Sequence, residues 1–240
     1  PACWYALFED AKAKASVAFA KDPSKPAFGP GDYLLYRSHF GDLQFMHSMG
    51  TQDGEAAEVT QARMRMWAKF LWGVAMKQIP TDKYIRELGI VGMEQYFPGD
   101  MTATNLFATG IVEVRRDLDK VAIGALLHMV QDSFSQAHTE RDQESGAACP
   151  SGVAKPGRIQ QFYSYARQEG SSHDAEDTFA ALANHTLQTS PSVIDVSREF
   201  INLWQRQASW EEAEKLFSCV FELAPGAPPA GPGRFEMSAK

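Results

Sequence analysis

The sequence predicts an all-α protein that folds as a single multi-helix bundle domain. Glycine and proline gather near residues 22–32, 98–101, 149–157 and 224–233, and the segments between these loops are rich in helix-favouring Ala, Leu, Glu, Gln, Met and Lys. Alternating β-branched residues, the pattern of a half-buried strand, are nearly absent. At 240 residues the chain buries roughly 70–75% of its unfolded surface, which is enough for one sizeable core.

The loops divide the chain into a series of expected helices. In chain order these helices span about 3–20, 33–49, 55–78, 81–90, 112–138, 173–189, 191–207 and 210–223. The fifth shows apolar residues at helical spacing, and the sixth begins with acids that complement the helix dipole. Ser190 and Pro191 suit the N-cap and first position of the seventh helix, and Ser209 with Glu212 suits the capping box of the eighth.

The last part of the sequence differs in composition from the rest. Residues 224–233 contain too much proline and glycine for helix or strand. The helical domain is therefore predicted over residues 1–223, followed by a Pro/Gly-rich tail over residues 224–240. The chain has no apolar run of eighteen residues, so no transmembrane span is expected.

Three cysteines allow one disulfide bond and leave one thiol. A bond between Cys3 and Cys149 is expected, because both residues lie outside the interiors of the expected helices. Cysteine usage by itself says little about the cellular compartment.

Histidine and aspartate are not spread evenly along the chain. Five of the six histidines fall in three clusters, and each cluster holds an aspartate three to five residues from a histidine. The clusters are His39, Asp42 and His47; His128, Asp132 and His138; and His173 and Asp177. His185 has no nearby acid, so it is interpreted as a core or capping histidine.

The second cluster has the spacing of a metal site on a helix. At about 100° per residue, Asp132 lies roughly 40° around the helix from His128, and His138 lies roughly 80° to the other side. A buried carboxylate costs several kcal/mol unless a cation compensates it, and a divalent metal ion does so well. The alternative is a core histidine hydrogen-bonded to an aspartate on a solvated face. For His173 and Asp177, the alternative is an exposed histidine beside acids that complement the helix dipole.

The residue types favour zinc. Imidazole with carboxylate and no cysteine suits zinc or a similar ion, whereas calcium and magnesium prefer oxygen ligands. Three clusters supply too many ligands for one tetrahedral ion, so at least two metal ions are expected.

The order of these residues resembles the zinc-dependent phospholipase C superfamily, in particular its bacterial phospholipase C branch. Fungal single-strand nucleases share the fold of this superfamily. The family order is Asp, His, then His-x-x-x-Asp-x-x-x-x-x-His, then His-x-x-x-Asp or Glu, and residues between about 35 and 180 match it. The run Ser38-His-Phe-Gly-Asp42 is also similar to the His-Phe-Trp-Asp run of clostridial phospholipase toxins.

The resemblance implies specific ligands for two or three zinc ions. The first ion would be held by Asp42, His47, His128 and Asp132. The second would be held by His138, His173 and Asp177. In the family a third ion is bound by the amino-terminal tryptophan, an early histidine and the aspartate that matches Asp132. Here the tryptophan is Trp4, which three residues precede, and the early histidine is His39. The resemblance also assigns Asp42 as the catalytic base.

The same resemblance implies a secreted or periplasmic phospholipase C that acts on a phospholipid membrane surface. Phosphatidylcholine or phosphatidylethanolamine would be hydrolysed to diacylglycerol and the phosphorylated headgroup. Aromatic residues near the ligands suit a choline cage or base stacking, namely Trp4, Tyr5, Phe40, Phe45, Tyr163 and Tyr165. The sequence does not indicate which headgroup is preferred, nor any protein partner.

Two alternatives remain open at this point. A single-strand nuclease or phosphatase of the same fold would use the same ligands, and a helical protein with purely structural zinc is the third interpretation. The net charge of −7 and the pI near 5.4 argue against strong non-specific binding to polyanions, so stable nucleic-acid binding is not expected. Structural zinc sites usually have four protein ligands, often cysteines, whereas the second set here has three ligands and no cysteine.

Overall fold

The computed structural model describes residues 2–108, 111–142, 147–176, 178, 180–181, 183–184 and 191–237. These residues are mostly helical, which confirms the predicted class in its coarse form. One small sheet of two antiparallel strands, β1 (Thr139–Arg141) and β2 (Ile159–Phe162), was not expected from the sequence.

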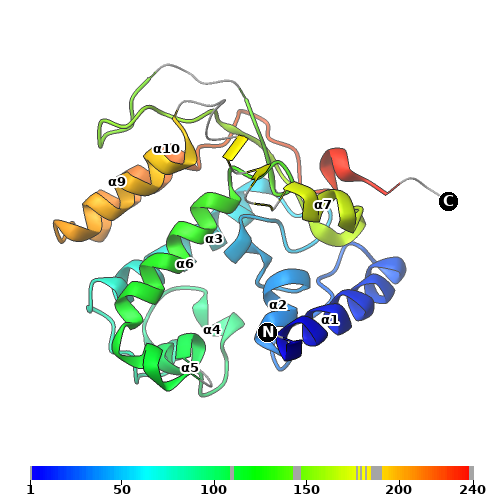
Figure 1. Cartoon of the computed structure of the whole chain (residues 1–240), viewed down its shortest axis with the longest axis horizontal. Coiled ribbons are helices and arrows are strands. Elements are labelled where there is room, and N and C mark those ends of the chain that lie inside the picture. Colours follow the sequence, from blue (N-terminus) through cyan, green and yellow to red (C-terminus); the bar gives the residue numbers. More distant parts are fainter. Residues whose placement is uncertain are drawn as a thin grey trace.

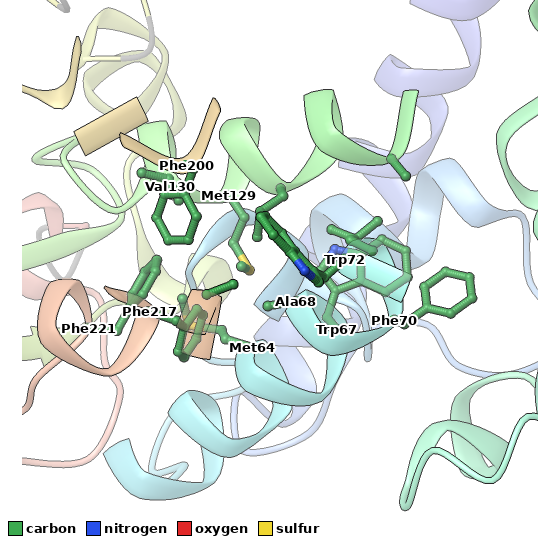
Figure 2. Packing of buried hydrophobic residues seen from close by; sticks show 14 of the residues in the cluster. Met64, Trp67, Ala68, Phe70, Trp72, Met129, Val130, Phe200, Phe217 and Phe221 are labelled. Carbon is green, nitrogen blue, oxygen red and sulfur yellow. The ribbon is translucent and has the colours of Figure 1, made fainter. Parts of the chain in front are cut away.

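The centre of the fold is a pair of helices, α3 (Ala57–Ala75) and α6 (Leu118–Asp132), which pack against each other. Two later helices, α9 (Val193–Gln205) and α10 (Trp210–Val220), also join this core. Figure 2 shows how their buried side chains meet, and the labelled residues are Met64, Trp67, Ala68, Phe70, Trp72, Met129, Val130, Phe200, Phe217 and Phe221. Burial of these apolar side chains, at about 25 cal/mol per Å², stabilises the fold around α6.

The first two helices form a separate side of the molecule. α1 (Ala2–Lys21) packs on α2 (Leu34–Phe40) through a small apolar cluster, at the edge opposite α9 (Figure 1). The prediction of one helix over 33–49 is wrong, because α2 ends at Phe40 and Gly41 is its C-cap. A Cβ atom there would lie 2.6 Å from the carbonyl oxygen of Phe28, so the chain must turn at a glycine.

The remaining helical elements are short. They are α4 (Met93–Tyr96), α5 (Ala103–Ala108), α7 (Gly170–Glu176) and the 3₁₀ turns η1 (Gln44–His47), η2 (Ile85–Glu87), η3 (Val112–Arg116), η4 (Tyr165–Arg167) and η5 (Gly233–Phe235). The expected helix over 81–90 is reduced to η2, and the expected helix over 112–138 is split into η3 and α6. α6 ends at Asp132, so His138 does not lie on the same helix as His128, and that expectation was wrong.

The starts of the last two helices have capping boxes. Ser209 and Glu212 form the predicted box at the start of α10, with hydrogen bonds in both directions. At α9 the N-cap is Ser192, which pairs with Asp195, and not the predicted Ser190. Ser190 lies outside the described residues. A side-chain oxygen at the N-cap satisfies a helical N–H group that has no partner within the helix.

Residues 224–237, here called the C-terminal segment, have no α-helix or β-strand, but they are bonded back to the body of the protein. The backbone N–H of Ala230 donates to the Glu55 carbonyl, and the N–H of Ser164 donates to the Gly231 carbonyl. Further along, the N–H of Glu169 donates to the Phe235 carbonyl over 2.8 Å. In Figure 1 this segment, in orange and red, accordingly runs beside α7.

The disulfide bond joins Cys149 to Cys219, so the predicted pairing of Cys3 with Cys149 is wrong. Cys3 lies exposed on α1 as a free thiol. The bond instead fastens the loop before β2 to the buried end of α10. Among the described residues, no helix is long and apolar enough to cross a membrane.

Removal of the disulfide bond should destabilise the protein. The bond spans 70 residues, and the chain-entropy estimate for a loop of that length is about 4 kcal/mol. We expect the double variant Cys149→Ser/Cys219→Ser to lose about that much free energy of unfolding, measured by urea denaturation. Cys3→Ser is the matched control and should leave the unfolding midpoint unchanged. An unchanged midpoint in the double variant would contradict the assigned pairing.

Candidate metal centre

Three side chains from two separate elements converge at the carboxyl end of α6. The Nδ1 atom of His47, at the end of η1, lies 2.9 Å from Oδ2 of Asp132 and 3.1 Å from Nε2 of His128. The Nε2 atom of His128 lies 3.2 Å from the same Asp132 oxygen. These residues are called the triad below, and the family resemblance assigns all three to the first ion.

The triad has the geometry of three ligands of one ion. A tetrahedral zinc ion with ligands at about 2.0–2.1 Å separates neighbouring ligand atoms by about 3.3 Å. The three observed separations of 2.9–3.2 Å are close to that value. Two imidazole nitrogens and one carboxylate oxygen thus lie close enough to one another to bind a single cation. This donor set fits zinc, and such an ion would keep a fourth position for water or substrate.

Asp132 is mostly buried and stays ionised. Burial raises the pKa of its carboxyl group, but the hydrogen bond with His47 and the charge of the nearby imidazoles outweigh burial, so the pKa lies below its ordinary value. The carboxylate is thus ready to bind a cation at neutral pH.

The position of His47 is fixed by the residue that follows it. Ser48 has a left-handed backbone with φ of 57°, which is uncommon for a serine. Its buried hydroxyl group donates to the Met129 carbonyl of α6 over 2.6 Å. This bond ties the end of η1 to the last turns of α6, and so brings His47 to the side chains of His128 and Asp132.

His39 lies beside the triad, with its ring centroid 4.8 Å from that of His47. Its Nδ1 atom lies 3.0 Å from the Leu35 carbonyl oxygen, which can only accept, so Nδ1 carries the proton and Nε2 carries the lone pair. Burial, with the nearby His47, lowers the pKa of His39 to about 4. His39 is therefore neutral at pH 7, in the protonation state that a metal ligand requires.

A second pair of histidines lies in the same cavity. The rings of His138 and His173 are stacked, with centroids 5.0 Å apart, and both residues are buried. Nδ1 of His138 donates to the His47 carbonyl over 2.6 Å, and Nδ1 of His173 lies 2.7 Å from Oε1 of Gln168. Partners of this kind fix the ring orientation of metal-binding histidines. The predicted third ligand, Asp177, lies outside the described residues, as does His185.

Asp42 has a different partner from the one that the sequence predicts. Both of its carboxylate oxygens accept from Arg37, at 2.8 Å each, and both side chains are largely buried. Asp42 is not among the described residues that line the cavity. Its role as ligand and base stays a prediction, and the ion pair with Arg37 competes with that role.

The histidines line a cavity of about 1300 Å³. Trp4, Phe8, Phe40 and Tyr165 form apolar parts of its wall, and Trp4 stacks on Phe8 with ring centroids 5.6 Å apart. Of the other predicted aromatics, Phe45 and Tyr163 are buried and Tyr5 is exposed, and none of the three is among the described lining residues. Phe8, Gln168 and Ser48 could not be predicted as parts of the site, because no motif marks them and each acts through a contact between distant segments.

Charge in the cavity wall is mainly acidic. Among the described lining residues, Arg141 is the one lysine or arginine, whereas Asp132, Asp142, Asp174 and Glu176 are acids. Burial lowers the pKa of Arg141 to about 9, and its guanidinium donates to backbone carbonyls, including those of Ser133, Gly157 and Val220. Arg141 thus holds the ends of α6 and α10, and a polyanion would find few cationic groups here.

Comparisons of this chain with models of protein families, with curated proteins and with solved structures find no match. The function is therefore inferred from the side chains of the cavity and the chemistry that they permit.

Proposed function

We propose that this protein is a zinc-dependent phosphodiesterase of the phospholipase C type. It hydrolyses phosphatidylcholine or phosphatidylethanolamine to diacylglycerol and the phosphorylated headgroup. The observation that supports this proposal is the convergence of His47, His128 and Asp132, with three further histidines in the same cavity.

Each group of side chains has a role in the proposed reaction. Zinc ions in the cavity would polarise a phosphodiester oxygen and lower the pKa of a bound water. The triad supplies one carboxylate and two imidazoles, and His138 with His173 supplies two more imidazoles in the same cavity. His39 keeps its Nε2 lone pair at neutral pH because its pKa is low. The buried carboxylate of Asp132 balances part of the positive charge of the ions.

The charge and the walls of the cavity favour a lipid over a nucleic acid. In the described part of the chain, the wall has one arginine, already bonded to backbone carbonyls, and several acids, an arrangement that repels polyanions and accepts a cationic headgroup. The aromatic residues Trp4, Phe8 and Tyr165 suit contact with a choline group or with acyl chains. We propose that the enzyme works outside the cytoplasm, where the bond between Cys149 and Cys219 persists.

A paired assay on one zinc-loaded preparation tests this function. We expect release of phosphorylated headgroup from phosphatidylcholine or phosphatidylethanolamine vesicles, little cleavage of single-stranded DNA, and loss of activity with a chelator. Elemental analysis should give at least two zinc ions per chain. Faster cleavage of DNA or RNA than of lipid would support a nuclease of the same fold, and the absence of zinc with chelator-resistant activity would overturn the proposal.

A further inference from the structure

Gln168 connects His173 to the C-terminal segment. Gln168 is buried, with 3% of its surface exposed. The Oε1 atom lies 2.7 Å from Nδ1 of His173. The Nε2 atom donates to the Ala137 carbonyl over 2.8 Å and to the Pro232 carbonyl over 3.2 Å. One side chain thus joins the histidine, the turn before His138 and the end of the chain.

These contacts allow one orientation of the Gln168 amide group. Carbonyl oxygens only accept, so the nitrogen must face Ala137 and Pro232, and the oxygen must face His173. The proton of His173 is then on Nδ1, and its lone pair is on Nε2. A rotated amide would place its oxygen, an acceptor, against both carbonyl oxygens and its N–H donors against the histidine.

The Pro232 carbonyl is itself held in place by its neighbours in the C-terminal segment. Gly233 has φ of 61° and lies against the ring of Tyr163, where a Cβ atom would be 2.3 Å from two ring carbons. Arg234 donates to Oε1 of Gln136, and the Phe235 carbonyl accepts from the N–H of Glu169. The segment is therefore fixed on both sides of the residue that bonds Gln168.

We propose that Gln168 is a positioning residue for His173, and that the C-terminal segment holds Gln168 in its active orientation. The inference rests on the proposed function, because it concerns the histidine pair of the same centre. It assigns to residues 224–237 a role in metal binding, which they exert on His173 through the side chain of Gln168. Loss of an outer-shell partner of a metal-binding histidine typically lowers metal affinity about 10- to 100-fold.

Two substitutions of Gln168 separate positioning from stability. Gln168→Met removes every polar contact of the side chain. Gln168→Glu loses both donors to the carbonyls, but its carboxylate presents an oxygen to His173 in either orientation, so it does not depend on the segment for its orientation. We expect both variants to unfold at lower urea concentration. Zinc titration against a competing chelator should show the affinity of the site at His138 and His173 reduced about 10- to 100-fold in Gln168→Met and near the wild-type value in Gln168→Glu. Equal loss of affinity in both variants would overturn the proposal.

Gln161, on β2, provides a matched control because it also bonds to the C-terminal segment. Gln161 donates to the Pro229 carbonyl over 2.8 Å and has no recorded contact with a histidine in the described part of the chain. Gln161→Met therefore removes a comparable bond to the C-terminal segment. It should leave zinc affinity unchanged, and a loss equal to that of Gln168→Met would show that any loosening of the segment has this effect.

Two glycines test the contribution of the segment itself. Gly233→Ala forces a methyl group against Tyr163, whereas Gly226→Ala adds one at a position that also has positive φ, 72°, with no atom within 4 Å. Backbone strain is thus similar in the two variants, but only Gly233→Ala displaces the segment beside Gln168. We expect the site at His138 and His173 to lose zinc affinity in Gly233→Ala and not in Gly226→Ala. No difference between them would overturn the role of the segment.

A readout without metal distinguishes failure of this inference from failure of the proposed function. The imidazole ¹⁵N shifts of the full chain, treated with chelator, report which nitrogen of His173 carries the proton. The wild type should show the proton on Nδ1, and Gln168→Met should show a mixture of tautomers. If the wild type bound no zinc, the proposed function would fail, while this measurement would still decide whether Gln168 positions His173. A mixture in the wild type would overturn the inference alone.

Discussion

Asp132→Asn is expected to remove zinc from the triad and to abolish hydrolysis. The carboxylate oxygen lies 2.9 Å from Nδ1 of His47 and 3.2 Å from Nε2 of His128, so it contributes to two of the three contacts that define the triad. An amide of the same size has no negative charge to balance the ion. An outer-shell substitution typically lowers metal affinity about 10- to 100-fold, and the loss of zinc affinity here should be larger. Equilibrium dialysis with elemental analysis measures it.

Asp142→Asn is the matched control for this variant. Asp142 lines the same cavity, but its carboxylate accepts from Arg158 and Gln160 and is not part of the triad. Its zinc content should equal that of the wild type. If Asp132→Asn kept its zinc and its activity, His128 and Asp132 would be an ordinary hydrogen-bonded pair at the end of a helix.

Asp42→Asn is expected to destabilise the protein and to leave the zinc of the triad in place. The carboxylate forms two hydrogen bonds with Arg37, whose guanidinium also donates to the Tyr96 carbonyl in the interior. Removal of one partner leaves a buried cation uncompensated, which typically costs 3–5 kcal/mol, so we expect a loss of about that size. Urea denaturation measures the loss, and elemental analysis measures the zinc.

The exposed pair of Lys25 and Asp22 provides the comparison. Its removal through Asp22→Asn should leave the unfolding midpoint nearly unchanged, because exposed ion pairs contribute little. A stable Asp42→Asn variant without zinc would support the role as ligand and base that the sequence predicts for Asp42. Destabilisation with full zinc would assign this residue to the fold.

The sequence was sufficient for the parts of the site that depend on one helical turn. His128 and Asp132 are four residues apart, so any helix brings them together, and the structure has them 3.2 Å apart on α6. His138 lies six residues after Asp132, and α6 ends at Asp132, so helical spacing does not apply to His138. His138 nevertheless enters the cavity, where its Nδ1 atom donates to the carbonyl of His47 at the end of η1.

Contacts between distant segments could not be read from the sequence. His47 reaches Asp132 because Gly41 breaks the helix before it and because Ser48 bonds to α6, and neither effect leaves a periodic pattern. The disulfide partner of Cys149 also depends on where α10 lies. The Pro/Gly-rich composition of residues 224–233 correctly excluded helix, but composition has no information on which carbonyls that segment offers to the rest of the chain.

His47 belongs to both halves of the centre, and this has a thermodynamic consequence. Its side chain contacts Asp132, while its backbone carbonyl accepts from Nδ1 of His138. Occupancy of the triad holds His47 still, and therefore also holds the acceptor that orients His138. By linkage, occupancy at the histidine pair must favour the triad by the same factor. Zinc should consequently bind with positive cooperativity, and partly loaded protein should be scarcer than two independent sites would give.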